Sequence, residues 1–176
     1  MDPSSDRFAF DDAAYARLRR RVAETLRGDE ARIVLSCSVY NGFAGRLEAD
    51  LGVQVERSDE AGIHDALAYG PHIGLAVSYP PSYAVIERRL REVGADRGGG
   101  CEPLPLLGEN AFAFADDEER YAAALGEATR EGVRPRGLDC VFLAQFSMDP
   151  FAARIAQGTS LPVVSALAAT LGRLAP

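Results

Sequence analysis

The chain has 176 residues, enough for one domain, or two small lobes, burying about two thirds of the unfolded surface without help from a metal or disulfides. Its formal net charge of −7 argues against nucleic acid or an anionic membrane as a partner, because both would repel it. All 19 basic residues are arginine, so the Schiff-base lysine that pyridoxal phosphate enzymes need is missing, and that chemistry is excluded.

Short apolar runs alternate with helical patterns along the chain, which predicts an α/β fold with a mostly parallel sheet covered by helices on both faces. Strands are expected at Arg32–Ser36, Val53–Glu56, His72–Ser78, Glu102–Leu107, Asp139–Ala144 and Leu161–Ser165. Helical patterns fill residues 12–27, 43–51, 59–69, 81–93, 116–132 and 166–174, and one more helix starts at Pro150 with Asp149 as its cap.

The first apolar run, Ile33-Val34-Leu35, has the length and β-branched character of a strand buried on both faces. Small polar residues follow this run, so Cys37 is expected at the carboxyl end of a strand, where open α/β sheets place their ligand sites. A second run, Cys140–Ala144, ends in the same way at Gln145. We therefore expect these two strand ends to face one pocket.

The cysteines indicate a reducing compartment, because the three are widely spaced and form no CxxC pair that would hold a metal. We expect Cys101, after three glycines, to be exposed, and Cys140 to be an inert core thiol. The first residues lack the pattern of a signal peptide, and no apolar run is long enough to span a bilayer. These features predict a cytoplasmic protein.

Four segments follow one another over residues 13–174. They are Val34-Leu35-Ser36-Cys37-Ser38, Ser58–Gly70, His72–Ser78 with Ser82, and Leu138–Met148 followed by Leu161–Ser165. Their order and spacing resemble the aspartate/glutamate racemase superfamily, the group of glutamate racemase, aspartate racemase, hydantoin racemase, maleate isomerase and arylmalonate decarboxylase. Leu143–Met148 is similar to the sequence Leu-Ala-Gln-x-Ser-Met, which one subgroup of the superfamily carries. In that subgroup this sequence replaces the end of the strand that bears the second catalytic cysteine.

The resemblance implies two similar lobes with mostly parallel sheets flanked by helices and the substrate between them. The first lobe would comprise residues 1–70 and 159–176, and the second lobe residues 71–158. Family members open with a strand before the first helix, whereas only Asp2–Phe10 precedes Asp11 here. The first lobe is therefore expected to be shortened at its N-terminus, and the strand edge left open predicts a homo-oligomer.

Racemases of this superfamily need no cofactor and use two cysteines that face each other across the substrate α-carbon. The resemblance implies that Cys37 is the catalytic thiol and that Gln145 occupies the place of the second cysteine. A neutral amide cannot shuttle a proton at neutral pH, but its NH2 group can donate to a carboxylate or enediolate oxygen. The resemblance implies a wider set of substrate-binding residues: Ser38, Val39, Tyr40, Ser78, Tyr79, Ser82, Gln145, Phe146 and Ser147.

The sequence thus favours a cofactor-independent enzyme of the racemase and isomerase type that acts on a small carboxylate with one thiol. Decarboxylation, cis–trans isomerisation through a thioether, and a non-catalytic relative that binds a carboxylate or a partner subunit remain alternatives. A Cys–His hydrolase is disfavoured, because neither His64 nor His72 lies in a motif that places it beside Cys37.

Overall fold

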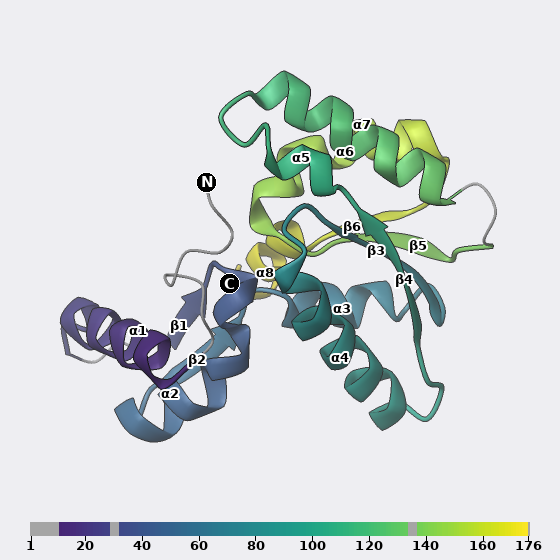
Figure 1. Cartoon of the computed structure of the whole chain (residues 1–176). Helices are drawn as coiled ribbons and strands as arrows, with labels where there is room; N and C mark the ends of the chain where they lie inside the picture. The colour runs from purple at the N-terminus through teal and green to yellow at the C-terminus, as the bar shows by residue number, and fades with distance from the viewer. Residues whose placement is uncertain (1–10, 29–31, 134–136, 176) are drawn as a thin grey trace.

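Two parallel sheets form the framework of the computed structural model, which describes residues 11–28, 32–133 and 137–175 (Figure 1). The smaller sheet pairs β1 (Arg32–Leu35) with β2 (Gln54–Arg57). The larger sheet has the strand order β4-β3-β5-β6, with all neighbours parallel. Its strands are β3 (His72–Val77), β4 (Glu102–Leu107), β5 (Cys140–Leu143) and β6 (Val163–Ser165). The predicted strands and the α/β class are confirmed, and β4, with its two prolines, lies at an edge.

Helices and short 3-10 turns connect the strands. They are α1 (Asp12–Thr25), η2 (Ser38–Phe43), α2 (Ala44–Leu51), α3 (Glu60–Ala66), α4 (Pro81–Asp96), α5 (Glu109–Phe112), α6 (Glu118–Val133), η3 (Phe146–Phe151), α7 (Ala152–Thr159) and α8 (Ala166–Leu174). Three of these helices have caps of the residue types that favour such positions. Asp11 accepts a hydrogen bond from the Ala14 amide, Gly52 ends α2 at a φ of 67°, and Ser165 caps α8.

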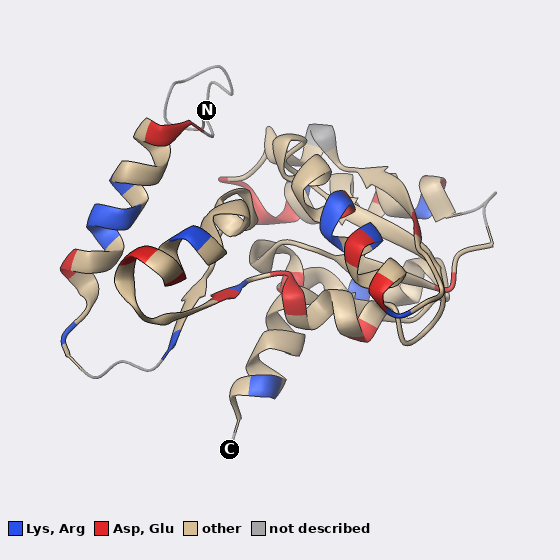
Figure 2. Cartoon of the chain, turned by 90° about the horizontal axis from the view of Figure 1, so that it is seen from below, with Lys and Arg blue, Asp and Glu red and all other residues tan. Residues whose placement is uncertain are grey.

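The larger sheet is covered on both faces, as its apolar strands require. In β5, Cys140 and Phe142 pack against the α3 and α4 side, while Val141 and Leu143 pack against α6 and α7. This alternation follows from the two-residue period of a strand. The strands β3, β5 and β6 carry no acidic residue and no lysine or arginine, whereas most charges lie on helices and loops (Figure 2). The hydrophobic effect therefore holds this half of the molecule together.

The smaller sheet is much less buried, and here one prediction is wrong. Ile33 and Val34 are only half-buried, so β1 is not enclosed on both faces. In the described part of the chain β1 pairs with β2 alone, and its other edge has no neighbouring strand. Tyr15, Leu47 and a few apolar neighbours form the small core beneath it. The prediction of two lobes with parallel sheets is confirmed, and within the described residues the first sheet is half the width of the second.

Two further expectations are corrected. Asp149 does not cap α7, because the turn η3 occupies residues 146–151 and α7 starts only at Ala152. The Asp149 carboxylate instead accepts a hydrogen bond from the Ser165 hydroxyl. Cys101 is 8% exposed rather than a surface residue, because its side chain joins the core under β3 and α4.

Strand β6 pairs with β5 and α8 packs against α3, so residues 159–175 contact elements that the sequence assigns to both predicted lobes. The proposed lobe boundaries remain a prediction. No helix among the described residues combines the length and the apolar character needed to cross a bilayer.

Candidate functional site

Cys37 and Gln145 occupy equivalent places in the two sheets. Each lies two residues beyond its strand, after Leu35 in β1 and after Leu143 in β5. Each has an extended backbone, with φ and ψ of −112° and 112° for Cys37 and −116° and 135° for Gln145. Each is followed directly by a 3-10 turn, η2 or η3. The same local geometry therefore presents a thiol at one strand end and an amide at the other.

The turn after β3 and the first residues of α4 contact the Cys37 end. The Ser38 hydroxyl donates to the Ser82 hydroxyl over 3.2 Å, and both side chains are buried. Burial raises the pKa of Tyr79, and the nearby Cys37 and Tyr40 raise it further. The Tyr79 ring also packs against Phe112 of α5, with 4.9 Å between centroids. The structure thus brings Cys37, Ser38, Tyr79 and Ser82 to one place.

The same turn contacts the Gln145 end. The Gln145 Oε1 atom accepts hydrogen bonds from the Ser78 backbone N–H over 2.8 Å and from the Ser78 hydroxyl over 3.1 Å. The Tyr121 hydroxyl donates to Ser78 Oγ over 2.8 Å. The residues Ser78 to Ser82 therefore link the strand end that carries the amide to the strand end that carries the thiol.

Tyr121 is a site residue that the sequence reasoning missed, although its position holds a signal. It lies in the first turn of α6 and shares the buried face of that helix with Leu125 and Thr129, at four-residue spacing. A helix that returns between two parallel strands begins at the edge where the strands end. A tyrosine hydroxyl on the buried face of that first turn is therefore directed to the site.

The other predicted site residues differ in how deeply they are buried. Val39 is buried, Tyr40 and Phe146 are half-buried, and Ser147 is exposed. The Tyr40 ring stacks on Phe43 with 6.4 Å between centroids, which fixes it on η2. Among the described residues, no group of three His, Cys, Asp or Glu side chains is arranged to hold a metal ion.

The three cysteines differ sharply in exposure, and all of them lie in the described part of the chain. Cys37 is exposed, whereas Cys101 and Cys140 are buried. Burial raises the pKa of Cys101 to about 11 and that of Cys140 to about 12, so both remain thiols at neutral pH. The Cys140 Sγ atom also lies 3.7 Å from the Ala66 carbonyl oxygen. Only Cys37 is accessible to a ligand.

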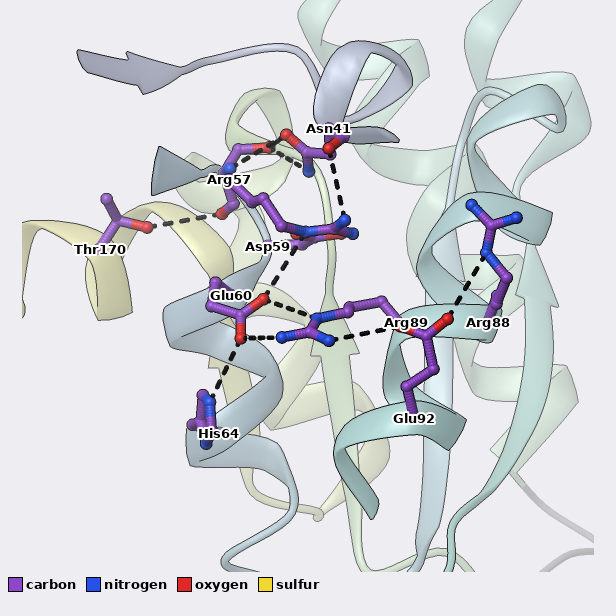
Figure 3. Close-up of polar contacts among 10 residues, drawn as sticks. Asn41, Arg57, Asp59, Glu60, His64, Arg88, Arg89, Glu92 and Thr170 are labelled. Carbon is purple, nitrogen blue, oxygen red and sulfur yellow. Dashed lines mark hydrogen bonds and ion pairs between the residues drawn. The ribbon is translucent and has the colours of Figure 1, made fainter. Parts of the chain in front are cut away.

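Buried polar contacts hold the turn that follows Cys37 (Figure 3). The Asn41 side chain, in η2, donates to Ser58 Oγ over 3.0 Å and accepts from the Ser58 backbone N–H over 3.2 Å. The Arg57 guanidinium donates to the Asn41 carbonyl over 3.3 Å and to both oxygens of the buried Asp59. These contacts tie η2 to the loop between β2 and α3.

An ion-pair cluster joins α3 to α4 beside this loop (Figure 3). The Arg89 guanidinium binds the two oxygens of Glu60 over 2.7 and 2.9 Å, and His64 lies 3.4 Å from the same carboxylate. Burial alone would raise the pKa of Glu60, but Arg89, Arg57 and His64 together lower it. The cluster fixes the helix that precedes the larger sheet to the helix that follows the Ser78 turn.

Solved structures of several enzymes share this fold. Allantoin racemase from Pseudomonas fluorescens has a TM-score of 0.67 and 19% identity, over 92% of this chain and 66% of that chain. Glutamate racemase isoform RacE1 from Bacillus anthracis has a TM-score of 0.70 and 12% identity, over 98% and 65%. Arylmalonate decarboxylase has a TM-score of 0.57 and 15% identity, over 90% and 75%.

These neighbours belong to the superfamily that the sequence resembles, and at such low identity they show the fold alone. The chain spans about two thirds of the length of the two racemases, 66% and 65%. No family model matches the sequence, and no curated protein matches it.

Proposed function

We propose that the protein is a cofactor-independent enzyme of the racemase and isomerase type that acts on a small carboxylate, such as an amino acid, with Cys37 as its catalytic thiol. The matched placement of Cys37 and Gln145 carries this proposal, because both stand two residues beyond parallel strands and at the start of a 3-10 turn. Cys37 is also the one exposed thiol of the three. Shared fold with two racemases and a decarboxylase supports the reaction class.

The substrate carboxylate would lie between the two strand ends. The Gln145 NH2 group and the Ser82 hydroxyl are hydrogen-bond donors suited to an anionic oxygen. The hydroxyls of Ser38 and Ser78 donate to Ser82 and Gln145 and would hold these two donors in place. Val39 would contribute its backbone N–H at the start of η2, where helix amides lack partners within the helix. The rest of the ligand would be surrounded by Tyr40, Tyr79, Phe146 and Ser147, which would set the shape of the site.

With a thiol on one side and an amide on the other, proton transfer is one-sided. Cys37 as a thiolate takes the α-proton, or as a thiol gives a proton to the enediolate. The Gln145 amide stabilises the enediolate oxygen but cannot accept a proton at neutral pH. Racemisation therefore needs a second acid or base, such as a water molecule.

Gln145 favours decarboxylation as a second candidate. A substrate with two carboxylates on one carbon loses CO2, the electron pair of the broken C–C bond forms the enediolate, and the Cys37 thiol protonates the carbon. This sequence of steps needs one proton donor only. Cis–trans isomerisation through a Cys37 thioether and non-catalytic binding of a carboxylate remain as further alternatives.

We also propose that the protein forms a homo-oligomer in the reducing cytoplasm. In the described residues the outer edge of β1 has no strand partner, and an open parallel edge invites pairing with another chain. The molar mass in solution at micromolar concentration tests the first part, and a strictly monomeric protein contradicts it.

Deuterium incorporation in D2O tests the function, because any reaction that passes through an enediolate labels the α-carbon, whichever acid is the substrate. We would incubate the protein with amino acids, hydroxy acids and substituted malonates, and record α-deuteration by NMR together with CO2 release. Cys37→Ala is expected to abolish turnover, and Cys101→Ala, which removes a buried thiol, is the matched control. A near-normal rate in Cys37→Ala would remove the thiol from the mechanism. Binding of an acid without turnover of any acid in the panel would favour the non-catalytic alternative.

A further inference from the structure

The hydrogen bonds from Tyr121 through Ser78 to Gln145 run in one direction only. The Ser78 backbone N–H can only donate, so the Gln145 atom 2.8 Å away must be the amide oxygen. The Ser78 hydroxyl uses its one proton on the same oxygen, over 3.1 Å. Its lone pair is then free to accept the Tyr121 proton over 2.8 Å. The chemistry of the donors therefore fixes the orientation of the amide.

The Gln145 nitrogen consequently points away from Ser78. Gln145 is half-buried, and within the described part of the chain no group accepts a hydrogen bond from its Nε2 atom. A buried or half-buried NH2 group that lacks a protein acceptor is available for a ligand oxygen. It would repel a ligand that presents an N–H donor at the same point, because neither group has a lone pair to offer.

We propose that Tyr121 is a positioning residue that, through Ser78, locks Gln145 with its NH2 group toward the ligand, so that this side of the site selects a carboxylate. The inference rests on the proposed function, because it assumes that Gln145 and Cys37 share one ligand. It adds the direction of selectivity and the residue that enforces it.

Removal of the Tyr121 hydroxyl should act on selectivity without much effect on packing. The Tyr121 ring is 7% exposed and packs against Phe151 at 5.4 Å between centroids, and phenylalanine keeps these contacts. Without the tyrosine donor, the Ser78 hydroxyl can turn away, and the amide oxygen keeps one donor instead of two. The NH2 group then loses its fixed direction, which weakens its hydrogen bond to a ligand by about fivefold in affinity.

Two alkylating reagents test the proposal at Cys37 itself, with no need for the natural substrate. Iodoacetate carries a carboxylate and iodoacetamide carries a neutral amide, and both react alike. The Cys37 sulfur forms a bond to carbon as the carbon–iodine bond breaks and iodide leaves. We define the preference as the iodoacetate rate over the iodoacetamide rate, divided by the same ratio for N-acetylcysteine. Mass spectrometry of the digested protein identifies the alkylated cysteine. We expect the product at Cys37, because Cys101 and Cys140 are buried.

The wild-type protein is expected to show a preference above one despite its net charge of −7. Tyr121→Phe should lower the preference about fivefold and leave the iodoacetamide rate unchanged, an outcome that a general loosening of the fold would not give. Tyr69→Phe is the matched control, because it removes a hydroxyl from a tyrosine that is 56% exposed. In a Ser78→Ala background, Tyr121→Phe should have no further effect, because Tyr121 acts only through Ser78.

The outcomes separate the inference from the proposed function. A wild-type preference that survives in Tyr121→Phe would overturn the positioning role and leave the carboxylate site standing. A wild-type preference of one or less would overturn both. If Tyr121→Phe fails to fold, the double variant Ser78→Ala/Tyr121→Phe removes both hydroxyls together and leaves neither unpaired. It should show the same loss, and a retained preference there would equally overturn the inference.

Discussion

The two strand ends of the site have the same local geometry but different support. Gln145 follows β5, whose four residues are all buried, and Ser78 and Tyr121 fix its amide. Cys37 follows β1, whose residues Ile33 and Val34 are half-buried, and it is exposed. The amide therefore follows a fully buried strand, and two hydrogen bonds from Ser78 fix its orientation. The thiol is an exposed group at the end of a small sheet, and the turn after it is anchored by polar contacts.

Replacement of Gln145 by cysteine should have the largest effect, because it puts the same chemical group at both strand ends. In the proposed arrangement, Gln145→Cys would place a second thiol opposite Cys37 and so provide an acid or base on each side of the α-carbon. We expect the product of α-protonation to change from one enantiomer to a mixture of both, which chiral chromatography measures. Gln145→Met, of similar length but without a titratable group, is the control. A product that stays a single enantiomer in Gln145→Cys would mean that the two positions do not face the same carbon.

A matched pair of valine substitutions measures how differently the two strands are buried. Val141 in β5 is fully buried and Val34 in β1 is half-buried. Val141→Ala should lower the free energy of unfolding by about 2–3 kcal/mol, and Val34→Ala by about 1 kcal/mol or less. Urea denaturation gives both values. Equal losses would show that β1 is as well enclosed as β5, for example by a second subunit.

The anchoring of the turn η2 predicts a loss of similar size at Asn41, which is 1% exposed and pairs with the buried Ser58. Asn41→Ala leaves Ser58 without these partners and should cost about 1–3 kcal/mol of stability. Alkylation of Cys37 by iodoacetamide should change in the same variant, because η2 follows Cys37 directly. Asn41→Ala combined with Ser58→Ala should recover part of the stability. An unchanged Cys37 rate would show that the turn does not depend on this contact.

The smallest expected effect is the dependence of stability on the Glu60 ion pair as the pH falls. The pKa of Glu60 is lowered in the folded protein, so its ion pair stabilises the fold above the unfolded carboxyl pKa and is lost as the pH falls through the folded value. Glu60→Gln should therefore cost about 1 kcal/mol or less at pH 7, since the pair is partly exposed, and nothing at a pH below both values. Unfolding curves at the two pH values test this. A larger cost at acid pH would contradict it.

The sequence was sufficient to locate the two key strand ends, because the information is local. An apolar run that stops at small polar residues gives the position of Cys37 and of Gln145, and the caps at Asp11 and Ser165 follow from their own residue types. The alternation of strands and helices was likewise enough to predict the parallel sheets.

The wrong or missing predictions concern burial and long-range contacts, which depend on parts of the chain that are far apart in the sequence. The burial of β1 depends on how many strands lie beside it, which the residues Ile33-Val34-Leu35 do not specify. Cys101 follows three glycines but its side chain is directed into the core by the pairing of β4 with β3. The contact of Tyr121 with Ser78 joins residues 43 positions apart. The helical spacing places Tyr121 on the buried face of α6, but it does not specify the partner of its hydroxyl.

The central claim is that the Cys37 thiol and the Gln145 amide contact the same small acid. A crystal structure of the protein with malonate tests it most directly. The proposal predicts a malonate carboxylate within hydrogen-bond distance of Gln145 Nε2 and the malonate methylene carbon facing Cys37 Sγ. Malonate bound at one of these groups only, or the two groups too far apart for one small acid to contact both, would contradict it.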